Sequence, residues 1–366
     1  MEHLGTDPCN HSSEEHMALV TCFIESVIQG VSIKNKDSIR SATVKGYADQ
    51  INELHKLRGF QPPIFNHRDN APFILYKALK EEEPIAKQRK PLTEEMVSEI
   101  IRLGDNAAPE SKEALIRDIV KASRLIGPRA AEIVQKTQSR ADVHTYPSGN
   151  KVIKALCPER ITGYDNRGRL VLNPVRNRAL VEKVAIEWAI QKNRKNGEIK
   201  WYSRDHLNPE MCMVDAMLNL LERAESLLQA DDLPFCVYRN NRGRTVYLTA
   251  QELTKYIRKV AKKLYPHMTE EELSYFSCHS LRVWAAVLLS EAGKDGDYIK
   301  IRLRWCSESY RVYLRDTLNS AIEHNRSLNT NSRNILYALN QSLLDDIDEE
   351  FDEIDAEEMG DYIDLE

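Results

Sequence analysis

The chain has 366 residues, 42% of them hydrophobic, which suffices for two domains or one large domain with ordinary cores. Its net charge of -5 hides an uneven distribution, because the last 22 residues (345–366) hold 13 acidic side chains and no Lys or Arg, and the rest carries a net +8. No apolar run or signal-peptide pattern indicates a membrane or secreted protein, and seven scattered cysteines without a Cys-x-x-Cys pair indicate neither zinc nor disulfides. A basic body with an acidic end is typical of proteins that contact nucleic acid, although a solvated surface with a solubilising tail has the same composition.

We expect residues 1–15 to be flexible and residues 16–83 to form a small helical domain, because apolar residues recur there at helical spacing. Residues 84–92 contain Pro84, Pro91 and several basic side chains, which predicts a linker. Basic residues of both segments form a candidate surface for a DNA backbone, the alternative being solvated lysines on a helical bundle. They are Lys34, Lys36, Arg40, Lys45, Lys87, Arg89 and Lys90.

Residues 93–330 read as a second domain of mixed character. Thr93 is a candidate cap for a helix, and the helical pattern of residues 111–135 is interrupted at Gly127-Pro128, which places Arg129 at the start of a new turn. Residues 151–204 predict strands, including a hairpin around residues 193–197, and helices resume from residues 211–228 onward. A last helix is expected at residues 331–344, before the acidic tail at 345–366. The fold class is therefore mainly α with a small antiparallel sheet.

The apolar run from Val283 to Leu289 predicts a buried helix, with Ser277 placed to cap its start. His279 and Arg282 then share one face of the first turn. A histidine and an arginine at a helix N-terminus form an anion site, and phosphate is the expected anion. By itself a His-x-x-Arg pattern occurs by chance in most proteins of this size, so it needs support from other motifs.

The order of motifs over residues 35–320 resembles the tyrosine recombinase (phage-integrase-type) family, in the style of its divergent members from eukaryotic mobile elements or viruses. Residues 41–47 resemble the entry to that family's helical core-binding domain, and residues 89–93 the join to its catalytic domain. Further matches follow in the family's order: Gly127-Pro128-Arg129 with Glu132, a hairpin lysine in residues 191–195, His279-x-x-Arg282, Trp305 and Tyr313.

The resemblance implies a metal-free and ATP-free phosphoryl transfer on double-stranded DNA by a homotetramer, with a covalent 3'-phosphotyrosyl intermediate. Arg129 and Arg282 would stabilise the phosphate charge, because two guanidiniums fit its oxygens. The remaining roles fall to Lys192 as general acid, His279 as hydrogen-bond partner and proton acceptor, Trp305 as a positioning group, Tyr313 as nucleophile, and Glu132 as a residue that orients the arginines or the histidine.

Several alternatives stay open from the residues alone. Lys195 competes with Lys192, and Tyr310 competes with Tyr313 because the two tyrosines lie three residues apart. The spacing from Trp305 to Tyr313 is one residue shorter than usual in the family, which also fits an inactive, domesticated copy that only binds DNA. A one-duplex topoisomerase would use a similar residue set. In a eukaryotic host we expect the protein in the nucleus, otherwise in the cytoplasm with DNA.

Overall fold

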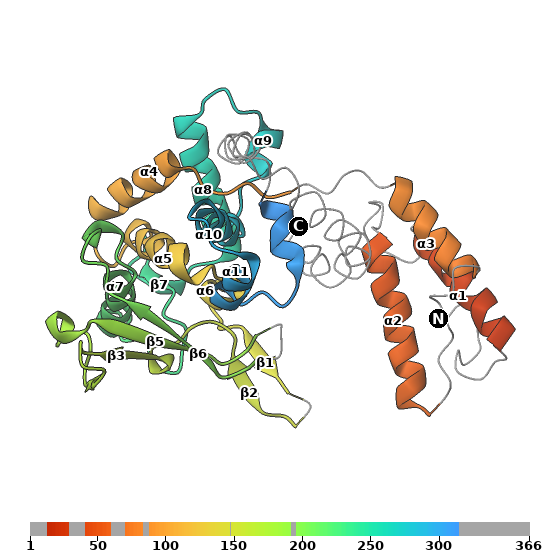
Figure 1. Ribbon diagram of the computed structural model, residues 1–366, viewed down its shortest axis with the longest axis horizontal. Coiled ribbons are helices and arrows are strands. Elements are labelled where there is room, and N and C mark those ends of the chain that lie inside the picture. Colours follow the sequence, from red (N-terminus) through yellow and green to blue (C-terminus); the bar gives the residue numbers. More distant parts are fainter. Residues whose placement is uncertain are drawn as a thin grey trace, which may run out of the picture. The chain divides into compact units, whose positions relative to one another are not determined.

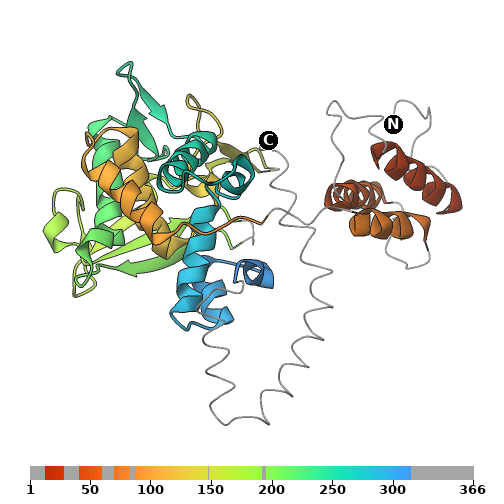
Figure 2. The ribbon, with the colours of Figure 1, turned by 90° about the horizontal axis from the view of Figure 1, so that it is seen from above.

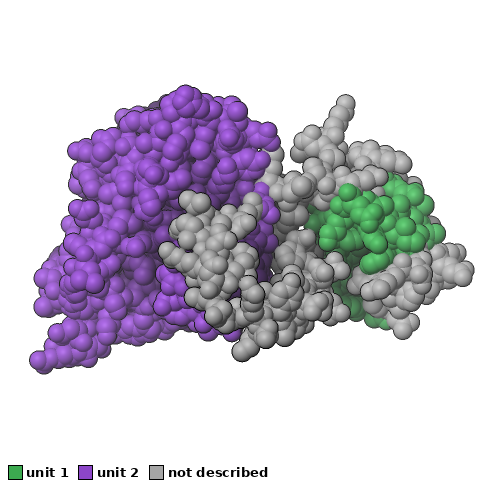
Figure 3. Space-filling view, turned by 45° about the horizontal axis from the view of Figure 1, so that its top comes forward, with its two compact units in different colours: residues 1–87, 328–366 green, residues 88–327 purple. Residues whose placement is uncertain are grey.

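The computed structural model describes residues 13–28, 41–59, 70–82, 88–146, 148–191 and 195–314, and these divide into two compact units. Figure 3 colours the described residues of unit 1 (within 1–87) green and those of unit 2 (within 88–327) purple. The boundary after residue 87 falls inside the segment expected to be a linker. The expected basic residues Lys34, Lys36, Arg40 and Lys87, the helix at 331–344 and the acidic tail lie outside the described residues.

Unit 1 is helical in its described residues, with α1 (Ser13–Ile28), α2 (Ser41–Leu57) and α3 (Ala71–Glu82) drawn in red and orange in Figure 1. Its core joins Val20 and Ile24 of α1 to Val44 and Ala48 of α2, and side chains of α3 pack against them. Apolar residues spaced three and four apart place these side chains on one helix face. Lys45 lies on α2 and is half-buried.

Unit 2 combines helices with short antiparallel strands, as Figures 1 and 2 show, which confirms the expected fold class. The α-helices are α4 (Glu94–Asp105), α5 (Lys112–Ile126), α6 (Ala130–Ile133), α7 (Met213–Ser226), α8 (Ala250–Leu264), α9 (Glu270–Ser274), α10 (Ser280–Glu291) and α11 (Gly296–Leu303). The 3-10 helices are η1 (Pro158–Arg160), η2 (Arg178–Leu180), η3 (Pro209–Met211) and η4 (Glu308–Tyr313).

The main sheet has four antiparallel strands in the order β4-β3-β5-β6. They are β3 (Ile161–Tyr164), β4 (Leu170–Val171), β5 (Lys183–Trp188) and β6 (Glu198–Ser203). The expected hairpin is β5-β6, with Ala185 opposite Trp201. Two further hairpins pair β1 (Val143–Thr145) with β2 (Lys151–Ile153) and β7 (Val237–Arg239) with β8 (Thr245–Tyr247). β2 lies in the segment expected to hold strands, but β1, β7 and β8 were not predicted, because strands of three residues are too short to show a period.

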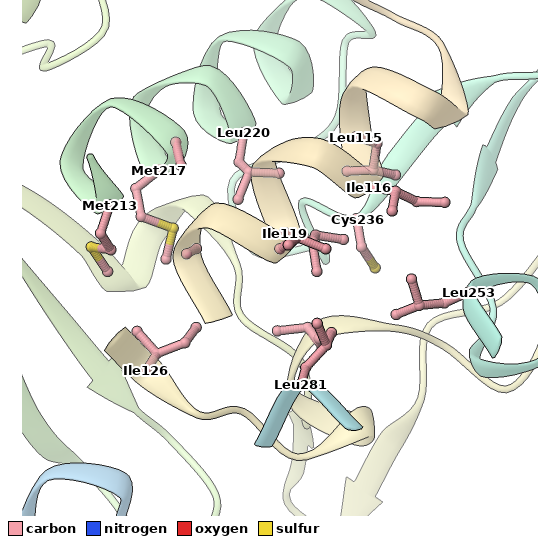
Figure 4. Close-up of a cluster of buried hydrophobic side chains, with 14 of the residues drawn as sticks. Leu115, Ile116, Ile119, Ile126, Met213, Met217, Leu220, Cys236, Leu253 and Leu281 are labelled. Atoms are coloured by element: carbon pink, nitrogen blue, oxygen red, sulfur yellow. The ribbon is translucent and has the colours of Figure 1, made fainter. Parts of the chain in front are cut away.

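The core of unit 2 is built around α5, which packs against α4, α7 and α10. Figure 4 shows Ile119 and Ile126 of α5 beside Met217 of α7 and Leu281 of α10. Side-chain caps fix where the surrounding helices begin: the Thr93 hydroxyl accepts from the Met96 amide, and the Asp295 carboxylate accepts from the Tyr298 amide. The core therefore holds α5, α6, α10 and α11 in one fixed arrangement.

Among the described residues no helix is both long and apolar enough to cross a membrane. Within the same ranges each cysteine is a free thiol, and no group of three or more His, Cys, Asp or Glu side chains is placed to hold a metal ion.

Candidate active site

The C-terminal end of α5 is the point at which the site is assembled. Gly127 ends this helix in the left-handed conformation with a φ of 47°. A side chain at this position would be strained and would also clash, because a Cβ atom would lie 2.8 Å from Cδ2 of Leu303. The Gly127 carbonyl accepts a 2.6 Å hydrogen bond from Nη1 of Arg282, and the Ile126 carbonyl accepts a 3.2 Å bond from Nη2 of Arg304. Carbonyls at a helix C-terminus favour cations, so this end gathers arginines.

Arg129 follows directly, at the start of the short helix α6, as expected from the Gly-Pro interruption. Its backbone amide donates to Oε2 of Glu132 at 2.8 Å, and its Nη1 lies 3.4 Å from Oε1 of the same carboxylate. The Arg129 side chain keeps 19% of its surface exposed. The Arg129 side chain is therefore partly exposed at the edge of a buried cluster.

Glu132, which was expected to orient the arginines or the histidine, is buried and contacts two arginines. Both carboxylate oxygens accept from Arg304 at 3.0 Å, in addition to the Arg129 contacts. Burial by itself raises the pKa of Glu132, but the charges of Arg304 and Arg129 outweigh burial and hold the pKa below its usual value. Glu132 is thus an anion that neighbouring guanidiniums stabilise.

His279 and Arg282 lie at the start of α10, with one correction to the expected capping. The helix begins at Ser280 with His279 at the cap position, and the Ser277 hydroxyl accepts from the His279 amide in the turn before the helix. Arg282 is 1% exposed, and its guanidinium carbon lies 4.0 Å from the ring centroid of Trp305. His279 and Arg282 therefore lie at the cap and in the first turn of α10, which is largely buried.

Tyr313 and His279 are in direct contact. Nε2 of His279 lies 3.0 Å from the Tyr313 hydroxyl oxygen, and the rings meet edge to face. Burial, followed by the positive charges of Arg282, Arg89 and Arg129, lowers the pKa of His279 to about 3. The imidazole is therefore neutral at physiological pH, and a neutral imidazole has one ring nitrogen able to accept a proton.

Trp305 connects the arginines to Tyr313. It follows α11, it is 5% exposed, and its ring centroid lies 5.8 Å from that of Tyr313. Within the described part of the chain its buried indole Nε1 has no hydrogen-bond partner. A buried N–H group without a partner is costly, so this donor is suited to an acceptor supplied by a ligand.

Tyr310 and Tyr313 occupy different surroundings although both belong to η4. Tyr310 is 2% exposed, and its hydroxyl packs so closely on Gly296 that a Cβ atom there would overlap it. Burial, only partly offset by a hydrogen bond with Arg311, raises the pKa of Tyr310. Tyr313, in contrast, is half-buried and contacts His279.

The segment that carries Tyr313 is tied to α11 by ion pairs. Glu308 contacts the ammonium group of Lys300, and its other oxygen lies 2.7 Å from Nε of Arg311. Burial alone would raise the pKa of Glu308, but its hydrogen bond with Lys300 contributes to a pKa below the usual value. These contacts fix the first turn of η4 next to the site.

The hairpin lysine and the linker residues are placed only in part. Lys192 lies outside the described residues, and Lys195 follows the gap, where its carbonyl accepts from Nε2 of Gln191 at 2.6 Å. Arg89 donates to the Ser274 carbonyl at 2.6 Å, so one of its donors is used within the protein. Lys90 is exposed and lies over the ring of Tyr275.

Arg304 was not predicted as part of the site. It is 2% exposed, it pairs with Glu132, and its guanidinium stacks 3.3 Å from the ring centroid of Trp188 on β5. The position ends α11 in the left-handed conformation with a φ of 61°, where glycine or asparagine is usual. Nothing in the local sequence indicates a buried arginine there, and only its place between two buried residues, Leu303 and Trp305, gives a hint.

No protein-family model matches this chain, and no curated protein matches it by sequence. Solved structures similar to it include the integrase of the Tn1549 transposon in complex with transposon right end DNA, at 10% identity, with 85% of each chain covered and a TM-score of 0.46. The XerH site-specific recombinase bound to palindromic difH substrate is similar at 16% identity over 84% of this chain and 69% of that one, with a TM-score of 0.45. The XerA recombinase is similar at 14% identity over 86% and 92%, with a TM-score of 0.36.

Proposed function

We propose that this chain is a tyrosine recombinase that cuts and rejoins double-stranded DNA through a covalent bond between Tyr313 and a 3'-phosphate. The observation that carries the proposal is the 3.0 Å contact between the Tyr313 hydroxyl and Nε2 of His279, next to buried arginines. Nε2 of His279 is close enough to receive the proton of the Tyr313 hydroxyl. The pair therefore supplies a nucleophile together with its base.

In the proposed step, the Tyr313 oxygen forms a bond to phosphorus while the bond from phosphorus to the 5'-oxygen breaks. The tyrosine proton moves to Nε2 of His279, and the ammonium group of Lys192 or Lys195 gives a proton to the leaving 5'-oxygen. Rejoining reverses these transfers, so the energy of the phosphodiester bond is kept in the phosphotyrosyl link. No nucleotide cofactor or metal enters this scheme.

The arginines account for the negative charge that builds up on phosphorus. Arg129 is partly exposed, Arg282 lies against Trp305, and the indole N–H of Trp305 offers one more donor. Donors that are already oriented in a site shielded from water stabilise such charge strongly. Burial, and after it the nearby cations, lowers the pKa of His279; a bound phosphate offsets the effect of the cations and so makes this residue a better base.

The number of subunits follows from the proposed reaction. Recombination of two duplexes requires four strand cleavages, and one nucleophile per subunit then requires a homotetramer on DNA. The net +8 of residues 1–344 supports contact with the DNA backbone. In a eukaryotic host this activity would take place in the nucleus. We also propose that the protein is encoded by a mobile element.

The test is a covalent trap with nicked suicide duplexes, in which the cleaved end diffuses away and the adduct accumulates. A pool of duplexes with randomised flanks is incubated with protein in EDTA, and the products are separated on denaturing gels. We expect an adduct with the wild type and with Tyr310→Phe, and none with Tyr313→Phe. Tyr310→Phe is the matched control, because it removes a hydroxyl from the same 3-10 helix.

An adduct that persists in Tyr313→Phe would reject Tyr313 as the nucleophile. DNA binding without any adduct in the wild type would instead support a copy that only binds DNA, the alternative that the short spacing between Trp305 and Tyr313 left open. Relaxation of supercoiled plasmid by the wild type, without exchange between duplexes, would indicate a topoisomerase.

A further inference from the structure

Arg304 connects three separate parts of unit 2 through its side chain and a fourth, α11, through its backbone. Its two terminal nitrogens donate to the two oxygens of Glu132, and Nη2 also donates to the last carbonyl of α5. Its guanidinium plane stacks on Trp188 of the main sheet, and its backbone ends α11. Nε of Arg304 has no hydrogen-bond partner among the described residues, so even this arginine is not fully satisfied.

The backbone at this position disfavours arginine. A left-handed conformation favours glycine, and full burial removes the guanidinium from water at a cost that only close pairing offsets. A glycine here would end α11 with less strain and without a buried charge. The arginine therefore points to a use for its side chain beyond ending the helix.

The contacts of Arg129 indicate that use. Arg304 holds Glu132 in the two-pronged geometry that is strongest for guanidinium and carboxylate, with both bonds at 3.0 Å. Arg129 makes a single 3.4 Å side-chain contact with the same carboxylate, and its Nη2 lies 3.4 Å from the carbonyl oxygen of Arg304. Two guanidiniums thus share one carboxylate, and the buried one holds it more tightly.

We propose that Arg304 is a positioning residue that occupies Glu132 and thereby keeps the guanidinium of Arg129 available to a phosphate. Without Arg304, the buried carboxylate would attract Arg129 into the two-pronged pair and withdraw it from the ligand. Arg304 does not itself touch the reacting atoms. This inference rests on the proposed function, since it names what prepares the anion-binding arginine of the same site.

The test removes Arg304 with and without its carboxylate partner. Arg304→Met should lower the affinity for inorganic phosphate about tenfold, measured by calorimetry, and should lower the single-turnover rate of adduct formation at saturating DNA about a hundredfold. In the double variant Arg304→Met with Glu132→Gln, no buried charge competes for Arg129, so both quantities should recover to within about tenfold of the wild type. A merely structural role predicts no such recovery.

Two further variants serve as a control and as a substitute for Arg304→Met. Arg302→Met, which changes an arginine on the same helix that contacts Trp201 and Tyr202 instead of Glu132, should leave both measurements unchanged. If Arg304→Met does not fold, as judged by circular dichroism, Arg304→Lys replaces it. Lysine keeps the charge but cannot pair with both oxygens, so it should give an intermediate loss that Glu132→Gln relieves.

The outcomes separate the two proposals. A wild type that binds phosphate but forms no adduct overturns the proposed function, and the phosphate affinities still decide the role of Arg304. Wild-type adduct formation that Arg304→Met leaves intact overturns the role of Arg304 alone, as does a folded double variant no better than the single one. A wild type that neither binds phosphate nor forms an adduct overturns both.

Discussion

Among the described residues of unit 2, two clusters place arginines around a buried carboxylate, and the two clusters differ in charge balance. In the first, Asp118 of α5 pairs with Arg223 at 2.7 Å and with Arg117 at 2.8 Å, and Arg117 also pairs with Asp105. Two carboxylates therefore meet two guanidiniums. The Asn219 amide donates to Asp118 as well.

In the second cluster, Arg129 and Arg304 share the single carboxylate of Glu132, which leaves a surplus positive charge, and Arg282 and the neutral His279 lie nearby. Both clusters are attached to the same helix, α5, which supplies Asp118 in its middle and carbonyls at its C-terminal end. A buried surplus charge is costly unless a ligand offsets it. We therefore expect a structural task for the Asp118 cluster and, under the proposed function, a binding task for the Glu132 cluster.

The largest expected effect is on the reaction and arises in the Glu132 cluster. Arg129→Gln should slow adduct formation about a thousandfold, which corresponds to about 4 kcal/mol, because one of the preorganised phosphate donors is lost. The free energy of unfolding should fall by less than about 1 kcal/mol, since Arg304 still pairs with Glu132. Single-turnover trapping and urea denaturation measure the two quantities, and a large loss of stability would contradict a binding role.

The converse change in the Asp118 cluster is expected to act on stability. Arg223→Gln leaves a fully buried carboxylate with fewer partners and should lower the free energy of unfolding by about 3 kcal/mol. The adduct rate per folded molecule should stay at the wild-type value, because the cluster lies outside the proposed site. Urea denaturation together with trapping at low temperature measures this contrast. A selective loss of rate would remove the distinction between the clusters.

The smallest expected effect is a pH dependence of stability from His279. Its pKa of about 3 in the folded protein lies below the ordinary 6.5, so the unfolded chain binds more protons between these values. Stability from this group is complete above pH 6.5 and is lost as the pH falls, by about 1 kcal/mol between pH 6.5 and 5.5. Comparing denaturation of the wild type and His279→Asn at both pH values isolates this contribution, and equal pH dependence would refute it.

Part of the site could be predicted because local rules decide it. The Gly127-Pro128 interruption placed Arg129 at the start of a helix, and the apolar run placed Arg282 in a buried first turn. Glu132 three residues after Arg129 is within reach on one helical turn. These features depend on neighbours in the chain, so composition and spacing are sufficient.

Other features depend on contacts between distant segments. Tyr310 and Tyr313 lie three residues apart on one short helix, and the sequence left both open as the nucleophile. In the structure Tyr310 packs on Gly296 at the start of α11, while Tyr313 contacts His279 at the start of α10. The short strands β1, β7 and β8 were missed for a related reason, since a strand of three residues is stabilised by its partner and not by its own pattern.

The sequence by itself determined the mainly helical class, the main hairpin, the helix break before Arg129 and the set of residue types suited to a phosphate. Only the tertiary structure decided which tyrosine contacts His279 and that Arg304 pairs with Glu132. The physical reason is that helix breaks and caps are local, whereas the burial of a charge depends on which carboxylate and carbonyls the fold brings to it.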